Sequence, residues 1–271
     1  MTGLADGGET GRTLADPLAE ALRIVALADE RRLLVRLMGG LAFHAQAPAW
    51  TARVSRADRD IDLATRGRDR KALAALLEAE GYTPDTHFNT LFGHKQLYFV
   101  DQARRRPVDV LVDAFEMCHR FELAGRLPAT YPTLPLAELL LSKLQVVKIN
   151  RKDVLDALIL LAEHPLGRED GAGESGGVAV INTGRIVELT SKDWGWWRTV
   201  TGNIDKLADF LATELREGEL DCGRPLRFDP AAQVVALRAA IDAAPKSSRW
   251  KLRSTVGDRV GWYMEPEEVG H

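Results

Sequence analysis

The stretch Arg59-Asp60-Ile61-Asp62-Leu63 reads as a short strand in which two aspartates alternate with two apolar residues. Successive side chains of a strand point to opposite faces, so Asp60 and Asp62 share one face and Ile61 and Leu63 the other. Two carboxylates this close repel each other unless a positive charge lies between them. Mg²⁺ supplies such a charge and prefers carboxylates together with water and phosphate oxygens. Taken alone, such a pair is more often a solvated strand face than a metal site.

Two further features accompany this strand. Gly39-Gly40 ends the apolar run 33–38 and precedes a helix-like segment. Paired glycines allow close backbone approach, and exposed N–H groups at a helix start favour phosphate, although an ordinary tight turn is the alternative. Asp109 lies inside the apolar run Val108–Val112, where an unpaired charge is expensive unless the residue faces water at a strand edge.

The surrounding sequence predicts the fold class. Apolar residues recur at helical spacing after Asp16, a candidate N-cap, and again over 68–80, where Gly81 suits the helix end. The runs 94–100 and 108–112 are rich in β-branched and aromatic residues and predict a hairpin. We therefore predict an α+β fold with a small mixed sheet and helices.

The pattern changes after Pro135. Helices are expected at 136–149, 154–161, 204–217 and 231–243, with a short strand at 185–189 and an exposed loop at about 165–180. The expected organisation is a flexible N-terminus (1–14), a core (15–134) and a mainly helical C-terminal domain (135–271).

Composition excludes several classes of protein. The chain has 271 residues and a net charge of −3, which is not the strongly basic balance typical of nucleic-acid-binding domains. No apolar run approaches the roughly 20 residues that span a bilayer, and the N-terminus lacks the pattern of a secretory signal. Two cysteines provide no disulfide framework. We expect a cytoplasmic protein without a membrane partner.

The order of motifs resembles the nucleotidyltransferase superfamily of the DNA polymerase β type: a glycine pair, a helix, an Asp-x-Asp strand, a helix, a hairpin and a strand with one central Asp. The resemblance implies that Asp60, Asp62 and Asp109 bind two Mg²⁺ ions, which hold a nucleoside triphosphate and activate the attacking hydroxyl. It also implies that Gly39 and Gly40 cradle phosphate, with Arg59 nearby.

A later stretch narrows this resemblance. Lys143 ends the run Leu139-Leu140-Leu141-Ser142-Lys143, and Arg151-Lys152-Asp153 is followed by Asp156. This resembles the helical region of AbiEii-type and MenT-like nucleotidyltransferase toxins. The resemblance implies that Lys143 contacts the triphosphate and that Asp153, Asp156 and Arg151 support the site. A surface helix with local ion pairs is the alternative.

The resemblance predicts a Mg²⁺-dependent enzyme that moves a nucleoside monophosphate from a nucleoside triphosphate to an acceptor hydroxyl. The acceptor would be RNA, tRNA or a protein, in a toxin–antitoxin or abortive-infection setting with a cognate antitoxin. One alternative is transfer to a small molecule such as an antibiotic. Another is an inactive nucleotide-binding or interaction module on the same fold, which Leu41 favours because the family usually carries Ser or Thr there.

Two other features have alternative interpretations. Basic side chains either hold phosphate or form a solvated surface; they are Arg53, Arg56, Arg59, Arg66, Arg68, Arg70 and Arg104-Arg105-Arg106. The motif Asp193-Trp194-Gly195-Trp196-Trp197 either stacks a base or forms a buried aromatic anchor that opens a helix.

Overall fold

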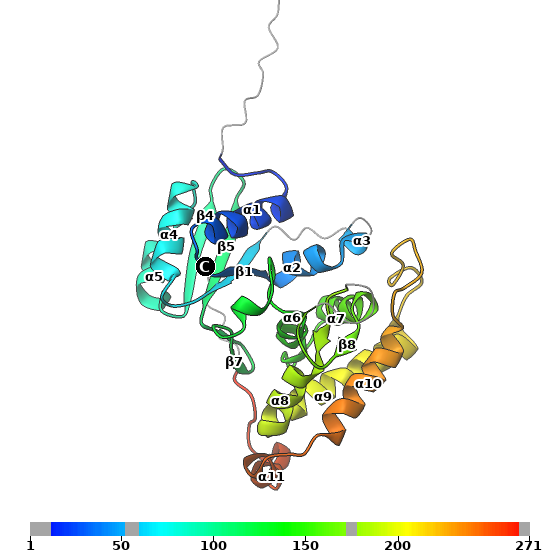
Figure 1. Cartoon of the computed structure of the whole chain (residues 1–271). Coiled ribbons are helices and arrows are strands. Elements are labelled where there is room, and N and C mark those ends of the chain that lie inside the picture. Colours follow the sequence, from blue (N-terminus) through cyan, green and yellow to red (C-terminus); the bar gives the residue numbers. More distant parts are fainter. Residues whose placement is uncertain (1–11, 52–59, 172–177, 266–271) are drawn as a thin grey trace, which may run out of the picture.

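The structure is a computed structural model, and it describes residues 12–51, 60–171 and 178–265. It has an α+β part built on one sheet and a mainly helical part that follows it in the chain (Figure 1). The predicted fold class is confirmed.

The larger sheet has five strands in the order β1-β2-β5-β4-β3. Strands β2 and β5 run parallel, and each other neighbouring pair is antiparallel, so the sheet is mixed. The strands are β1 (Val35–Met38), β2 (Ile61–Thr65), β3 (Thr83–Pro84), β4 (Gln96–Asp101) and β5 (Arg106–Val112).

One face of this sheet forms part of the hydrophobic core. Ile61, Leu63, Val108 and Val110 alternate with polar residues along β2 and β5, and all four are fully buried. Helices α1 (Pro17–Glu30), α4 (Arg70–Ala79) and α5 (Thr86–Phe92) belong to this part of the molecule. The opposite face carries Asp62 and Asp109 and is only half-buried, because full burial would remove both carboxylates from water at a high cost in free energy.

Helix α1 shows how local chemistry sets the helix boundaries. The Asp16 carboxylate accepts a hydrogen bond from the Ala19 N–H at 2.7 Å, and Pro17 occupies the first turn, where its missing N–H costs nothing. Gly81 follows α4 with φ +97°, a conformation that favours glycine. Both capping predictions are confirmed.

The C-terminal part is mainly helical. One continuous cluster of buried hydrophobic residues extends from α1 through the sheet to α10, so the division at residue 135 remains a prediction. The helices of the C-terminal part are α6 (Leu136–Leu144), α7 (Arg151–Glu163), α8 (Thr183–Lys192), α9 (Trp194–Asp209), α10 (Pro230–Ala243) and α11 (Ser248–Ser254). A π-helical turn (Phe210–Glu214) extends α9, and short 3₁₀ turns cover Leu127–Ala129 and Gly257–Arg259.

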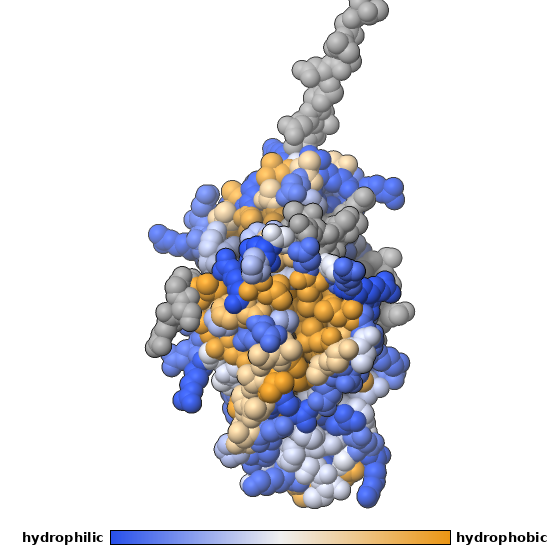
Figure 2. All heavy atoms as spheres, turned by 90° about the vertical axis from the view of Figure 1, so that its right-hand side faces the viewer, coloured by the Kyte–Doolittle hydropathy of each residue, from blue (hydrophilic) through white to orange (hydrophobic). Residues whose placement is uncertain are grey.

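The remaining elements are short. Helix α2 (Gly39–Gln46) follows β1 directly and leads to α3 (Pro48–Thr51). A second cluster of buried residues joins α3 to α7, and it contains Ala47, Trp50, Ile159, Ala162 and Cys222. Hydrophobic residues also gather on the surface at this side of the molecule (Figure 2). The small strands are β6 (Ala114–Glu116), β7 (Arg120–Glu122), β8 (Leu166–Gly167) and β9 (Ile181–Asn182).

The expected strand at 185–189 is wrong, because these residues lie inside α8. The Asn182 side chain accepts a hydrogen bond from the Arg185 N–H at 3.1 Å and caps the helix. Ile186 and Thr190, four residues apart, are both fully buried on one helix face. This spacing outweighs the strand preference of the adjacent Ile186 and Val187. The helix expected over 136–149 also ends earlier, at Leu144.

Among the described residues, no helix is both long and apolar enough to cross a membrane.

Candidate active site

The sheet register brings two of the three predicted carboxylates together. Asp62 on β2 is the direct partner of Asp109 on the parallel strand β5. Neighbouring strands lie about 4.8 Å apart, and directly paired residues point to the same side of a sheet. Asp62 and Asp109 are therefore neighbours on the half-buried face.

Asp60 lies one residue before β2 and is exposed. Asp60 and Asp109 both act electrostatically on Tyr98, which lies on β4 directly opposite Asp109. Burial raises the pKa of Tyr98, and the negative charges of Asp109, Asp60 and Asp85 raise it further. Asp60 and Asp109 thus lie within electrostatic reach of the same phenol.

The side chains are not arranged as a finished metal centre. In the part of the chain that the structure describes, no group of three or more His, Cys, Asp or Glu side chains is placed to hold a metal ion. The shared sheet face and the carboxylate chemistry nevertheless suit Mg²⁺. The three-carboxylate metal site remains a prediction.

The glycine pair lies against Asp62. Gly39 has φ +62° and begins α2 immediately after β1, whose last residue, Met38, is paired with Asp62. A Cβ added at Gly39 would lie 1.8 Å from Asp62 Oδ2, so no side chain fits without moving the carboxylate. The N-cap residue, Met38, makes no side-chain hydrogen bond to the start of α2. The turn therefore leaves room for the carboxylate beside a helix start that its own N-cap residue does not cap.

Leu41 on α2 is 2% exposed and belongs to the hydrophobic core. Its presence in place of Ser or Thr reflects packing of this helix.

Gln96 is a residue of this site that the sequence analysis missed. Its Nε2 donates to Asp109 Oδ1 at 2.5 Å. Gln96 lies on β4 opposite Leu111, two residues along from Asp109, so its side chain shares the face of Asp109. The sequence predicted the hairpin that contains Gln96, but only the exact strand register places its side chain beside the Asp109 carboxylate.

Lys143, Asp153 and Asp156 form a buried cluster between α6 and α7. Lys143 Nζ lies 2.6 Å from Asp153 Oδ1 and 3.1 Å from Asp156 Oδ2, and the Asp156 side chain is 1% exposed. Burial alone would lower the pKa of Lys143, but the two carboxylates outweigh it and raise the pKa above its ordinary value. These are not the surface ion pairs of the alternative interpretation.

This cluster also touches α2. The Lys143 ammonium lies 5.1 Å from the centroid of the Phe43 ring. Phe43 lies on α2, one helical turn after Gly39. The contacts of Lys143 thus join α6 and α7 to α2, the helix that begins at the glycine turn. Its predicted role toward a triphosphate remains untested.

The predicted supporting arginines have other contacts or lie outside the described residues. Arg151 Nη2 is 2.6 Å from Glu219 Oε2, and the guanidinium packs 4.5 Å from the Phe210 ring centroid. Arg151 therefore fastens α7 to the segment after α9. Arg59 lies outside the described residues, as do Arg53 and Arg56.

The hairpin arginines bind the chain itself. Arg104 Nη2 donates to the Thr13 carbonyl at 2.7 Å, and Arg106 Nη2 donates to the Leu14 carbonyl at 2.6 Å. Arg106 is buried and also pairs with Asp101 at 3.2 Å. These two arginines hold the segment before α1, and only Arg105 of the trio is exposed.

The tryptophan motif forms a buried anchor at the start of α9, as one of its two interpretations predicted. Trp194 and Trp196 are each 5% exposed, and the Asp193 carboxylate caps the helix by accepting from the Trp196 N–H at 3.0 Å.

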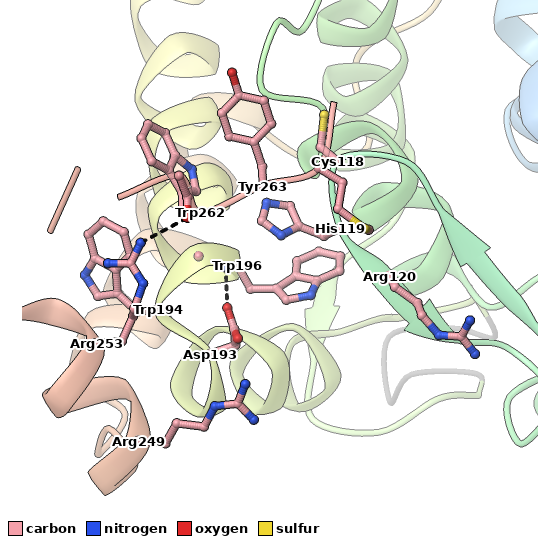
Figure 3. Close-up of a pocket in the computed structure, with 13 residues that line it drawn as sticks. Cys118, His119, Arg120, Asp193, Trp194, Trp196, Arg249, Arg253, Trp262 and Tyr263 are labelled. Carbon is pink, nitrogen blue, oxygen red and sulfur yellow. Dashed lines mark hydrogen bonds between the residues drawn. The ribbon is translucent and has the colours of Figure 1, made fainter. Parts of the chain in front are cut away.

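A pocket of about 440 Å³ opens beside this anchor (Figure 3). Neither the predicted site residues nor Gln96 line it.

In a comparison with known protein families, residues 20–102 match the family model of aminoglycoside-2''-adenylyltransferase. The chain is a nucleotidyltransferase. The matched segment runs from α1 to the end of β4, so it contains the glycine turn, Asp60 and Asp62. A comparison with curated proteins found no match.

Three solved structures resemble this nucleotidyltransferase. The lincosamide antibiotic adenylyltransferase LnuA, bound to lincomycin, is 14% identical and has a TM-score of 0.38 over 55% of this chain and 96% of its own. The antibiotic-resistance factor ANT(2'')-Ia is 19% identical, with a TM-score of 0.35 over 53% and 80%. The STING-associated CdnE c-di-GMP synthase from Capnocytophaga granulosa is 13% identical, with a TM-score of 0.25 over 83% and 80%.

The coarse prediction of a nucleotidyltransferase is confirmed by the family match. The narrower resemblance to AbiEii-type and MenT-like toxins has no counterpart in these matches.

Proposed function

We propose that this enzyme transfers a nucleoside monophosphate, with adenylate as the first candidate, from a nucleoside triphosphate to a hydroxyl of a small-molecule acceptor. The observation that carries the proposal is the pairing of Asp62 with Asp109 beside a glycine turn that has no room for a side chain. The family match favours adenylate and an antibiotic-like acceptor, because the matched family consists of aminoglycoside adenylyltransferases.

In this proposal Asp60, Asp62 and Asp109 would hold Mg²⁺. Bound there, the ion would supply Lewis-acid chemistry, lowering the pKa of the acceptor hydroxyl and offsetting charge on the leaving pyrophosphate. Gln96 orients the Asp109 carboxylate by donating a hydrogen bond to its Oδ1. In this proposal Asp109 serves as, or assists, the general base.

The remaining residues bind the triphosphate in this proposal. Backbone N–H groups at the Gly39-Gly40 helix start face negative charge favourably, and glycine permits close approach. Lys143 on α6 contacts Phe43, which lies one helical turn after Gly39 on α2, and in this proposal its ammonium binds the triphosphate, with Asp153, Asp156 and Arg151 in support. Arg59 completes the proposed set.

The second candidate is transfer to RNA, tRNA or a protein, in a toxin–antitoxin or abortive-infection setting with a cognate antitoxin. The buried cluster of Lys143, Asp153 and Asp156 favours it, because the resemblance to AbiEii-type and MenT-like toxins depends on these residues. Both candidates use the same carboxylates and differ in the acceptor.

The test is incubation of the full chain with Mg²⁺ and each α-labelled nucleoside triphosphate. Separate reactions contain an aminoglycoside and lincosamide panel, total RNA, or cell lysate. We expect label on a small molecule, and a loss of about hundredfold or more for Asp62→Asn and for Asp109→Asn. Asp242→Asn, on the exposed surface of α10, is the matched control.

Label on RNA or protein would move the conclusion to the second candidate. Binding of a nucleoside triphosphate without transfer to any acceptor would support the inactive module instead. Equal transfer by Asp62→Asn and Asp242→Asn would refute the proposed site.

A further inference from the structure

We infer that the pocket beside the start of α9 is a second binding site, for a small multivalent anion with phosphate or carboxylate groups. Three segments far apart in sequence form it: the turn between β6 and β7, the start of α9, and residues 249–264 (Figure 3). Its volume of about 440 Å³ lies within the range of small-molecule sites. This inference does not rest on the proposed transfer reaction.

The charged groups around the pocket favour an anion. Arg120, Arg249 and Arg253 line it, and Asp193 is the one carboxylate among the lining residues. Burial lowers the pKa of the lining His119 to about 4, against the opposing effect of the Asp193 carboxylate, so its ring is neutral at pH 7. Arg120 has acidic partners in Glu116 and Glu122, which leaves Arg249 and Arg253 as the positive charges of the site.

Arg253 is held rigidly, and none of the carboxylates that the structure describes pairs with it. Its guanidinium donates to the carbonyls of Gly257, Val260 and Gly261 at 2.8, 2.7 and 3.3 Å. It also lies 4.6 Å from the centroid of the Trp194 ring. Carbonyl oxygens orient a guanidinium but do not cancel its charge, so Arg253 presents a fixed positive charge at the pocket wall.

Arg249 is positioned to bind a ligand. It is exposed, and among the described residues no carboxylate pairs with it. In the view of Figure 3 the Arg249 guanidinium lies below the Asp193 side chain, and the Arg120 guanidinium points away from the Trp196 indole. A guanidinium forms paired hydrogen bonds to phosphate or carboxylate, which gives this group both charge and geometry for such a ligand.

The walls of the pocket are preformed. His119 Nε2 and Trp262 Nε1 both bond Thr199 Oγ1, at 2.8 and 3.0 Å. The Met264 N–H donates to the Cys118 carbonyl at 2.9 Å, which ties the C-terminal segment to the β6–β7 turn. Gly195 permits this packing, because a Cβ there would lie 2.5 Å from the Trp262 carbonyl oxygen. Little order has to be created when a ligand binds.

The test is calorimetric titration of the full chain with pyrophosphate and, separately, citrate. The solution contains EDTA and no nucleotide, so the carboxylate site is not loaded with metal. We expect saturable binding by the wild type. Arg249→Glu should weaken it about tenfold or more, because a charge-assisted contact is lost. Arg31→Glu, at an exposed arginine after α1, is the matched control and should not change the affinity.

Asp193→Asn gives a change in the opposite direction. Asparagine also caps helices, so α9 keeps its start while the pocket loses its one negative charge. We expect tighter binding in this variant, which a purely structural perturbation would not produce. The inference is overturned if the wild type shows no saturable binding, if Arg249→Glu binds like Arg31→Glu, or if Asp193→Asn fails to bind more tightly.

Discussion

At the scale of single residues, the missing Cβ of Gly39 makes the room that Asp62 occupies. We expect Gly39→Ala to lower kcat at least tenfold, because the new Cβ displaces the Asp62 carboxylate and φ +62° strains an L-residue. Gly81→Ala is the matched control: Gly81 also has a positive φ, but no atom lies within 4 Å of its added Cβ. It should lose stability and keep its activity. Equal activity losses in the two variants would contradict this role of Gly39.

Gln96 acts on the same site through Asp109. Gln96→Glu places a second negative charge beside Asp109, where the amide now donates at 2.5 Å. Like charges disfavour ionisation, so the acid limb of the pH–rate profile should move to higher pH. Gln102→Glu, in the exposed hairpin turn, adds the same charge without this contact and is the control. An unmoved acid limb in Gln96→Glu would exclude a positioning role.

At the scale of elements, the pairing of α6 with α7 depends on Lys143. Lys143→Met removes the ammonium that lies against Asp153 and the fully buried Asp156, which should lower the free energy of unfolding by about 3 kcal/mol. The raised pKa of Lys143 means that its stabilisation is complete at neutral pH and is lost as pH rises through its folded-state pKa.

Chemical denaturation measures this effect. Lys148→Met, at an exposed lysine, should change stability little. Adding Asp156→Asn to Lys143→Met should restore part of the loss, because it removes a buried negative charge that Lys143 no longer offsets. No difference between the two lysine variants would show that the cluster does not hold the helices together.

Sequence patterns identified most elements because their spacing and caps are local. The 3.6-residue period and Asp16 predicted α1, and the β-branched runs predicted β4 and β5. Residues 185–189 were misassigned because Ile186 and Val187 favour strands, whereas the burial of Ile186 with Thr190 is known only from tertiary packing.

The site was predicted only in part, because strand order is not local. The sequence supplied Asp62, Asp109 and the glycine pair, but the position of β2 beside β5 comes from the sheet. The contact of Gln96 needs the exact register, and the Lys143–Asp153–Asp156 cluster needs two helices to pack. The pocket at the start of α9 depends on contacts between residues more than a hundred positions apart, such as Met264 with Cys118.

At the scale of the whole molecule, buried histidines link stability to pH. Burial depresses the pKa of His119 to about 4 in the folded state, against an ordinary value of 6.5, so the unfolded chain binds an extra proton between these values. Stability contributed by neutral His119 is therefore present above pH 6.5 and is lost as pH falls toward 4, with a slope approaching about 1.4 kcal/mol per pH unit. Burial lowers the pKa of His164 as well, which adds a slope of the same sign.

Thermal unfolding between pH 4 and 7 measures this dependence. His119→Gln should flatten it, and His94→Gln, at an exposed histidine, should not. An identical pH dependence in the wild type and His119→Gln would contradict the assignment.

The central claim is that Asp62 and Asp109, paired across β2 and β5, hold the divalent metal of nucleotidyl transfer. Titration of Mn²⁺, followed by electron paramagnetic resonance in the presence of a non-hydrolysable triphosphate analogue, tests it most directly. We predict saturable binding of two ions by the wild type, and loss of at least one of them in both Asp62→Asn and Asp109→Asn. Wild-type Mn²⁺ binding by both variants would contradict the claim.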